Sequence, residues 1–187
     1  MVGNDIVDIN EAKSASNWQR PRFLEKLFTT KEQFTIRNAE TPFLMVWQLW
    51  SMKEAAYKLY TQQHPSRFYN PKGFECSTEG AISMVRFKTF TCYVATQITP
   101  YYIISEARLD VQPITSKVIK FKNTTAKAQS KTIRNTVLKA AANVFGVSKT
   151  HLKISTSRHG VPSIHVKSKV QPLSLTHHGN YGAYAFC

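Results

Sequence analysis

The sequence of 187 residues predicts an α+β fold with a seam near its middle. Apolar residues recur at helical spacing within residues 17–61 and again within residues 130–147. Runs rich in β-branched and aromatic residues follow each helical region, as is typical of strands. Between the two regions, from Pro113 to Ser130, the composition shifts to Lys, Thr, Ser and Ala. Both helices and strands are therefore expected on either side of this seam.

The first region should open with a short strand and continue with helices. Thr29 followed three residues later by Glu32 is the order of a helix N-cap. Two prolines and two glycines within residues 62–80 favour a loop. In chain order we expect a strand at "VGNDIVDI" (2–9), a helical pattern from about Asn17 to Asn38, a longer helix from about Pro42 to Thr61, and mostly loop at 62–80 with a short strand around Phe74.

The rest of the chain should be mainly strands, interrupted by one long helix. Apolar residues at helical spacing and a closing Gly146 define that helix at residues 130–147. Partial alternation and β-branched or aromatic residues define the strands. In chain order we expect strands at 82–90, 92–98 and 101–110, then the helix, a strand at "LKIST" (152–156), a turn at "RHGVP" (158–162), a strand at "SIHV" (163–166), and the closing segment "PLSLTHHGNYGAYAF" (172–186).

The composition describes an ordinary globular chain with an unusual charge distribution. Mean hydropathy is −0.30, no apolar run is long enough to span a membrane, and the three cysteines, which lack metal-type spacing, favour a reducing cytoplasm. All 11 acids precede Val111, whereas 12 Lys and Arg follow it, so nearly all of the net charge of +14 lies in the second region. Such a region suits a polyanionic partner: nucleic acid, an anionic nucleotide cofactor or an acidic protein.

The segment "LWSMKEAAYK" (49–58) combines a large aromatic side chain with charged ones. At helical spacing Trp50, Glu54 and Lys58 share one face, and Lys53 points about 100° away from it. An Asp on a strand and a Glu on a helix can converge as Mg²⁺ ligands, which makes Asp5 and Glu54 a candidate pair. The alternative is that Glu54 simply pairs with Lys58 on a solvated helix face.

The closing segment carries a second candidate site. In "SLTHHGNYGAYAF" two hydroxyls and His177 precede a glycine turn, where they could donate hydrogen bonds to phosphate oxygens. A histidine at a strand end can equally be structural. No HExxH, Walker or GxGxxG pattern occurs, and no aromatic–basic pattern typical of RNA binding is present. The residues alone therefore leave the nature of the polyanion open.

Three stretches together resemble the signatures of 4'-phosphopantetheinyl transferases. "GNDIVDI" is similar to the family's G-x-D strand, "LWSMKEAAYK" to its W/F-x-x-K-E-A/S-x-x-K helix, and "SLTHHGNYGAYAF" to its S-x-S/T-H strand. "RFLEKLFTTKE" resembles the family segment between the first two. The resemblance implies the family's α+β fold, two similar halves that each pack a small antiparallel sheet against helices. We expect a metal-binding half at residues 1–112 and a basic half at 113–187.

The resemblance also implies an activity: Mg²⁺-dependent transfer of the 4'-phosphopantetheine arm of coenzyme A to a serine of an apo acyl or peptidyl carrier protein, releasing 3',5'-ADP. Asp5 and Glu54 would hold Mg²⁺ against the coenzyme A pyrophosphate. Lys58 would contact phosphate as well, and either Glu54 or a metal-bound water would take the serine proton. Asp8 is a third candidate metal ligand, although it lies one residue beyond the D-x-E spacing of the longer family type.

The cofactor contacts implied by the resemblance involve both halves. His177 would meet the pyrophosphate or the 3'-phosphate side of coenzyme A, with Ser174 and Thr176 nearby. Lys53 would help to hold the cofactor, and Arg158 is a further candidate in the basic half, as are Lys131 and Arg134. The lysine of the longer type's G-K-P motif is replaced in Gly160-Val161-Pro162, so one expected cation is absent from that position.

The motif order is that of the short, trimeric type of acyl-carrier-protein synthase, but the spacing is not. Residues 130–187 look like the first half of the longer, monomeric type, and residues 1–112 look like its second half. We therefore favour a circularly permuted long type, a monomer whose two ends lie close together, over a homo-trimer. Termini that meet at the surface are what makes a permutation tolerable.

Two other function classes remain as alternatives. A basic nucleic-acid-binding protein would show salt-dependent binding and would not need Asp5 or Glu54. A non-catalytic relative would bind coenzyme A or a carrier without transfer. We expect instead a cytoplasmic holo-acyl-carrier-protein synthase type of enzyme, with no nucleic acid and no membrane among its partners. Its carrier, whether for fatty-acid, polyketide or peptide synthesis, is not specified by the sequence.

Overall fold

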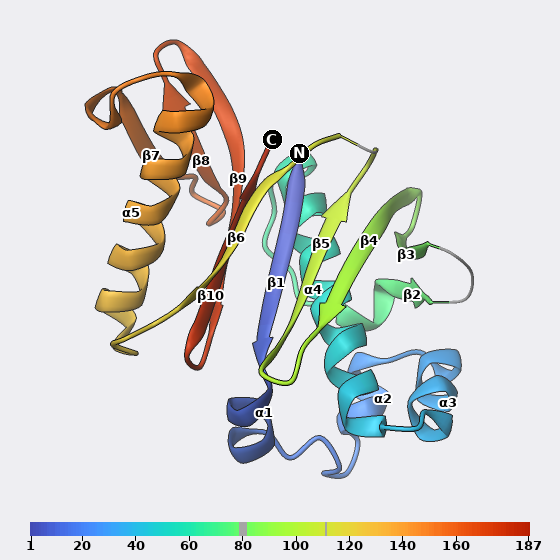
Figure 1. The fold of residues 1–187 in the computed structure, drawn as a ribbon. Helices are drawn as coiled ribbons and strands as arrows, with labels where there is room; N and C mark the ends of the chain where they lie inside the picture. The colour runs from blue at the N-terminus through green and yellow to red at the C-terminus, as the bar shows by residue number, and fades with distance from the viewer. Residues whose placement is uncertain (79–81, 111) are drawn as a thin grey trace.

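The computed structural model describes residues 1–78, 82–110 and 112–187 (Figure 1). The expected loop at 62–80 therefore falls outside the described residues at its last two positions. The elements in chain order are β1 Val2–Asp8, α1 Ile9–Ala15, α2 Phe23–Leu27, α3 Thr30–Asn38, α4 Pro42–Gln63, η1 Pro71–Gly73, β2 Glu75–Ser77, β3 Ser83–Phe87, β4 Phe90–Ile98, β5 Tyr102–Arg108, β6 Thr115–Lys120, α5 Ala126–Phe145, η2 Lys149–His151, β7 Leu152–Thr156, β8 Pro162–Val166, β9 Lys169–His178 and β10 Tyr181–Phe186.

The strands form two antiparallel sheets, each packed against helices, which confirms the expected α+β class. The first sheet has the order β1-β5-β4-β3-β2 and the second the order β6-β10-β9-β8-β7. Figure 1 shows α4 behind the first sheet and α5 beside the second. All strands of the first sheet lie before residue 109, and all strands of the second lie after residue 114. Each sheet is thus built from one continuous part of the chain.

Helix α4 packs against β1 and β5 at close range. Pro42 starts the helix, where its missing N–H is not needed, and no proline or glycine interrupts the following residues. Its buried face includes Leu49, Met52 and Leu59. Gly3 makes the close packing possible, because a Cβ atom there would overlap the backbone carbonyl oxygen of Ala55. The approach of β1 to α4 brings the "GND" and "KEAAYK" segments together.

The helical region before α4, expected over residues 17–38 with an N-cap at Thr29, is divided at that cap. It forms the two short helices α2 and α3, and the break falls at Thr29. Thr29 Oγ1 accepts the backbone N–H of Glu32 at 3.3 Å, and Glu32 Oε2 accepts the backbone N–H of Thr29 at 2.8 Å. This reciprocal pair is a capping box, which confirms the predicted N-cap and starts a new helix.

The second sheet is covered by α5, which begins at Ala126 and so extends the helix expected at 130–147. Gly146 ends it in the left-handed region with φ of 61°, as expected of a C-terminal glycine. Ile133, Val137 and Ala141 pack into a separate core with strand residues such as Leu173. Within the expected seam at 113–130, the structure forms β6, which pairs along β10. The seam is therefore partly a strand.

The two sheets meet where β1 lies beside β9. Three alternate backbone N–H groups of β1 are accepted by three alternate side chains of β9 (Asn4 by Ser174 Oγ at 2.9 Å, Ile6 by Thr176 Oγ1 at 3.3 Å, Asp8 by His178 Nδ1 at 2.9 Å). The outer edge of β1 is thereby paired without a backbone ladder, and an unpaired sheet edge is avoided. This β1–β9 junction fixes the two halves against each other.

The two ends of the chain lie side by side, as the permuted arrangement requires (Figure 1). The side-chain amide of Gln62 donates to the carbonyl oxygens of Val2 and Leu173, at 2.7 and 3.3 Å. Leu173 in turn pairs with Phe186 in the second sheet. The permutation itself, and the choice between monomer and trimer, remain predictions.

Candidate active site

Asp5 lies at the centre of the contacts between β1, α4 and β9. Its side chain is 12% exposed. Asp5 Oδ1 accepts hydrogen bonds from Lys58 Nζ at 2.8 Å and from Thr176 Oγ1 at 2.9 Å. Within the described part of the chain, Oδ2 has no hydrogen-bond partner. One oxygen is thus fixed by neighbours from both halves, and the other is available to a ligand.

Lys58 pairs with Asp5 and not with Glu54, so the simple pairing of Glu54 with Lys58 along the helix is not what the structure shows. Lys58 Nζ also donates to the carbonyl oxygen of Asn4 at 3.0 Å. The side chain is 27% exposed, which leaves its third N–H in reach of a bound anion.

Glu54 lies one turn before Lys58 and has no hydrogen bond or ion pair among the described residues. Burial, and secondarily the negative charge of Asp5, raise the pKa of Glu54 to about 7 against the opposing effect of Lys58. The side chain borders a small cavity of about 260 Å³, which Trp50 and Tyr69 also line. A carboxylate that is unpaired, open to a cavity and titrates near neutral pH can ligate a cation or accept a proton.

Asp8, the third candidate metal ligand, does not join Asp5 and Glu54. Asp8 Oδ1 accepts the backbone N–H groups of Asn10 and Glu11 and so caps α1, while Oδ2 accepts the backbone and side-chain N–H groups of Asn180. Burial acts to raise the pKa of Asp8, but these hydrogen bonds outweigh it and hold the pKa below its usual value. Its oxygens are already used, and Asp8 serves the fold instead.

The donor set fits Mg²⁺ as a two-carboxylate site. Nowhere in residues 1–78, 82–110 and 112–187 do three His, Cys, Asp or Glu side chains gather as a metal-ligand cluster. Asp5 Oδ2 and the unpaired Glu54 carboxylate are two oxygen donors close enough for the charge of Asp5 to raise the pKa of Glu54. Mg²⁺ is often held by one or two carboxylates, with waters and substrate phosphates completing its shell. The chemistry of these residues is therefore suitable for that ion.

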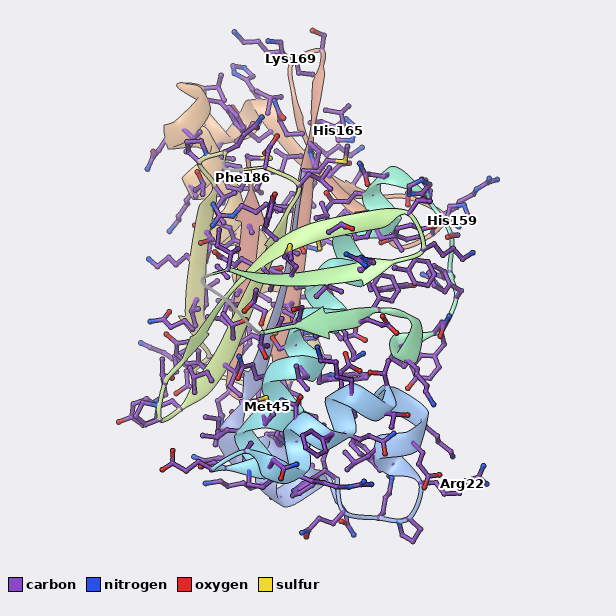
Figure 2. All side chains as sticks on the ribbon, turned by 90° about the vertical axis from the view of Figure 1, so that its right-hand side faces the viewer. Arg22, Met45, His159, His165, Lys169 and Phe186 are labelled. Carbon is purple, nitrogen blue, oxygen red and sulfur yellow. The ribbon has the colours of Figure 1, made fainter. Side chains whose placement is uncertain are left out.

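A cleft of about 550 Å³ opens between the two halves beside Lys58. It lies between the C-terminal part of α4, the loop that follows, the turn before β8, and β9. His159 from that turn lies beside the end of α4 (Figure 2). The cleft is lined by Tyr57, Lys58, Thr61, Gln62, Arg67, Phe68, His159, Gly160, Val161, Pro162, Leu173, Ser174 and Leu175. Tyr57 and Phe68 also line the cavity at Glu54, so the two spaces adjoin.

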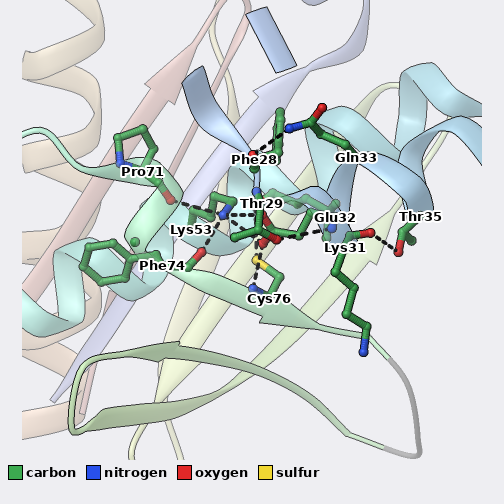
Figure 3. Close-up of polar contacts among 12 residues, drawn as sticks. Phe28, Thr29, Lys31, Glu32, Gln33, Thr35, Lys53, Pro71, Phe74 and Cys76 are labelled. Carbon is green, nitrogen blue, oxygen red and sulfur yellow. Dashed lines mark hydrogen bonds and ion pairs between the residues drawn. The ribbon is translucent and has the colours of Figure 1, made fainter. Parts of the chain in front are cut away.

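Lys53 is not positioned to hold a cofactor, contrary to the expectation from the motif. Its side chain is 1% exposed, and Nζ is 2.8 Å from Glu32. The ammonium also donates to the carbonyl oxygens of Pro71 and Phe74, so all three of its protons are used (Figure 3). Although the residue borders the cavity at Glu54, its charge is directed into the protein. Lys53 therefore anchors α4 against α3 and the η1 turn.

The predicted residues of β9 divide between its two faces. Ser174 and Thr176 face β1, and Ser174 borders the cleft, while Thr176 contacts Asp5. His177 lies on the opposite face and is exposed, and the structure does not bring it to Asp5 or to the cleft. His178, which sequence reasoning missed, shares the face of Ser174 and Thr176. The alternation of side chains along a strand is the signal that could have identified it.

The basic candidates of the second half also lie outside the cleft. Arg158 is exposed and directs Nε toward the imidazole of its neighbour His159, at 2.9 Å. Arg134 reaches Thr156 from α5, and Lys131 is exposed on the same helix. None of the three lines the cleft among the described residues. The cleft takes its cations from the first half instead, through Lys58 and Arg67, and no motif marked Arg67.

Comparison with known protein families agrees with the geometry. The sequence model described as "4'-phosphopantetheinyl transferase superfamily" matches residues 1–103, which include Asp5, Glu54 and Lys58. No curated protein matches the chain. In the described residues, no helix combines the length and the apolar character that crossing a membrane requires.

Proposed function

The chain belongs to the 4'-phosphopantetheinyl transferase superfamily, and on that basis we propose that it transfers the phosphopantetheine arm of coenzyme A to a serine of an apo carrier protein. The observation that carries the proposal is the convergence of Asp5, Glu54 and Lys58 beside a cleft shared by both halves. In this transfer the serine oxygen bonds to the phosphorus that bears pantetheine. The bond from that phosphorus to the bridging oxygen breaks, and 3',5'-ADP leaves.

We assign Mg²⁺ to Asp5 Oδ2 and Glu54. When bound there, the ion would neutralise negative charge on the pyrophosphate and stabilise the leaving oxygen. The chain's own part is to fix the ligands. Thr176 and Lys58 hold Asp5 Oδ1 from opposite halves, so that the free oxygen keeps one direction. Positioned charges of this kind account for much of catalysis in phosphoryl transfer.

Lys58 and Glu54 carry the remaining roles in the proposal. Lys58 is held by Asp5 and Asn4 and directs its remaining N–H toward the cleft, where it would bind a phosphate oxygen. Glu54 is also a candidate acceptor of the serine proton, because its carboxylate has no hydrogen-bond partner among the described residues and borders a cavity. A water near Glu54 is the alternative acceptor.

The family and the charge of the chain support proposals for the carrier protein and for the oligomeric state. The acid-free sequence after Val111 suits the acidic surface of a carrier protein. We propose an acyl or peptidyl carrier as the acceptor, with a fatty-acid synthesis carrier as the first candidate for a holo-acyl-carrier-protein synthase type. Because Asp5 and Lys58 meet Thr176 and the cleft within one chain, we favour a monomer with a complete site.

The test is the intact mass of an apo acyl carrier protein incubated with the chain, coenzyme A and Mg²⁺, with an EDTA control. We expect the carrier to gain one phosphopantetheine, about 340 Da by the stoichiometry of a single transfer, only when metal is present. A panel with a peptidyl and a polyketide carrier would identify the acceptor. Binding of coenzyme A without any mass gain across the panel would contradict transfer and support a non-catalytic relative.

A further inference from the structure

We propose that Arg67 is a phosphate-binding residue of the cleft, supplied by the loop after α4. The inference rests on the proposed function, because it takes coenzyme A as the ligand. Arg67 lines the same cleft as Lys58 but lies beyond the C-terminal end of α4, at the turn that precedes β8. A ligand with phosphates at two positions could therefore meet a cation at each.

The exposed guanidinium of Arg67 makes one hydrogen bond to the protein and is only partly used. Its Nε donates to the carbonyl oxygen of His159 at 3.1 Å. Its Nη2 lies against Gly160, where a Cβ atom would stand 2.8 Å away, and the φ of 86° at Gly160 also favours glycine. Within the described part of the chain, neither Nη1 nor Nη2 has a hydrogen-bond acceptor. Four N–H donors of the guanidinium thus have no acceptor within the described protein.

The surroundings of Arg67 favour an anion. No aspartate or glutamate lines the cleft among the described residues, whereas Lys58, Arg67 and His159 all do. A guanidinium presents paired N–H groups whose geometry matches two phosphate oxygens at once. Since no carboxylate neutralises it, the group is available for such a bidentate contact.

The contact of Arg67 with the turn also links the two halves. Arg67 belongs to the first half, and its fixed partner His159 belongs to the second, 92 positions later in the chain. The first half therefore provides a cation at the Gly160-Val161-Pro162 turn, which has no lysine of its own. A phosphate bound by Arg67 would lie against both walls of the cleft.

The test is calorimetric binding of coenzyme A and of 3'-dephospho-coenzyme A, with Mg²⁺, to the wild type and to Arg67→Met and Arg67→Lys. We expect Arg67→Met to weaken coenzyme A binding about 10- to 100-fold, the usual worth of a charge-assisted pair of hydrogen bonds, and Arg67→Lys to weaken it less. Arg86→Met is the matched control, because Arg86 is an exposed arginine of β3 that lines no described cleft.

The two ligands identify the phosphate that Arg67 binds. Loss of affinity for coenzyme A alone assigns Arg67 to the 3'-phosphate, and equal loss for both ligands assigns it to the pyrophosphate. Either result supports the proposal. Unchanged binding by Arg67→Met would overturn it, as would a loss seen with Arg158→Met instead, or a wild type that binds neither ligand.

Failure of the proposed function gives a different pattern. A wild type that binds coenzyme A but transfers nothing to any carrier contradicts the transferase activity, and in that case the binding data still decide the role of Arg67. A wild type that transfers normally while Arg67→Met binds and transfers equally well contradicts Arg67 alone.

Discussion

Helix α4 carries two lysine–carboxylate pairs on two of its faces, and their surroundings differ sharply. Lys53 and Glu32 are 1% and 3% exposed, and every proton of the ammonium has an acceptor (Figure 3). Lys58 and Asp5 are 27% and 12% exposed, and Lys58 borders the cleft; one N–H of the lysine and one oxygen of the aspartate are unused. The Lys53–Glu32 pair is closed to ligands, and we call it the sealed pair. The Lys58–Asp5 pair is accessible, and we call it the open pair.

The comparison shows that the role of a lysine in the motif, structural or ligand-binding, depends on whether its ammonium has an N–H donor without a protein acceptor. In the sealed pair, Glu32 also accepts the backbone N–H groups of Thr29 and Cys76, so it joins α3, α4 and β2. In the open pair, Thr176 and the β1 backbone hold the partners but leave part of each free. We therefore expect substitutions in the sealed pair to affect stability, and those in the open pair to affect activity.

The largest effect should come from breaking the sealed pair. Lys53→Met leaves Glu32 buried without a counter-charge, and we expect the free energy of unfolding to fall by about 3–5 kcal/mol in urea denaturation. Lys58→Met, the matched change at the open pair, should lower it by only about 1 kcal/mol, because solvent reaches that pair. Equal losses from the two substitutions would contradict the distinction.

Removing Lys58, the lysine of the open pair, should instead reduce the rate of transfer. We expect Lys58→Met to lower kcat/KM for transfer about 10²- to 10³-fold, the usual result of losing one fixed donor to a charged transition state. The measurement is the rate of mass gain by the carrier at a temperature where circular dichroism shows the variant folded. Near wild-type turnover would remove Lys58 from the site.

A smaller effect should follow from the contact that joins the halves at Asp5. Thr176→Val keeps the shape of the side chain but removes the hydrogen bond that it donates to Asp5 Oδ1 and the one that it accepts from the backbone N–H of Ile6. We expect the Mg²⁺ concentration for half-maximal activity to rise about tenfold, as is common when a group that orients a metal ligand is lost. Thr176→Ser restores the hydroxyl and should restore the metal dependence. If serine fails to do so, Thr176 acts through packing alone.

The smallest effect concerns the protonation of Glu54 in metal-free protein. Because the pKa of Glu54 is about 7 in the fold and its ordinary value is 4.5, the native state holds the proton more tightly than the unfolded chain. Stability should therefore fall as pH rises from 4.5 to 7, and this contribution should be constant outside that window. After solvent screening we expect about 1 kcal/mol.

Comparison with Glu54→Gln isolates this contribution. The variant does not titrate at this position, so the difference in unfolding free energy between it and the wild type should change across the window. Urea denaturation in EDTA at several pH values measures the difference. Parallel pH profiles of the two proteins would contradict the raised pKa of Glu54.

Local patterns in the sequence determined most of the elements and the candidate side chains of the site. The capping box at Thr29, the stop at Gly146 and the opening strand were all predictable, because each depends on a few neighbouring residues. Asp5, Glu54 and Lys58 were identified from the motifs for the same reason. The family and the α+β class followed from the motifs together with the order of the elements.

Only the tertiary structure decided which of these groups are free to act. Lys53 and Lys58 belong to the same motif. Packing against α3 buries Lys53, whereas Lys58 lies beside the junction of β1 with β9 and lines a cleft. The carboxylate of Asp8 caps α1. Arg67 donates a hydrogen bond to His159, which lies 92 positions later in the chain. Contacts of that separation depend on how sheets and helices pack, which periodicity along the chain does not encode.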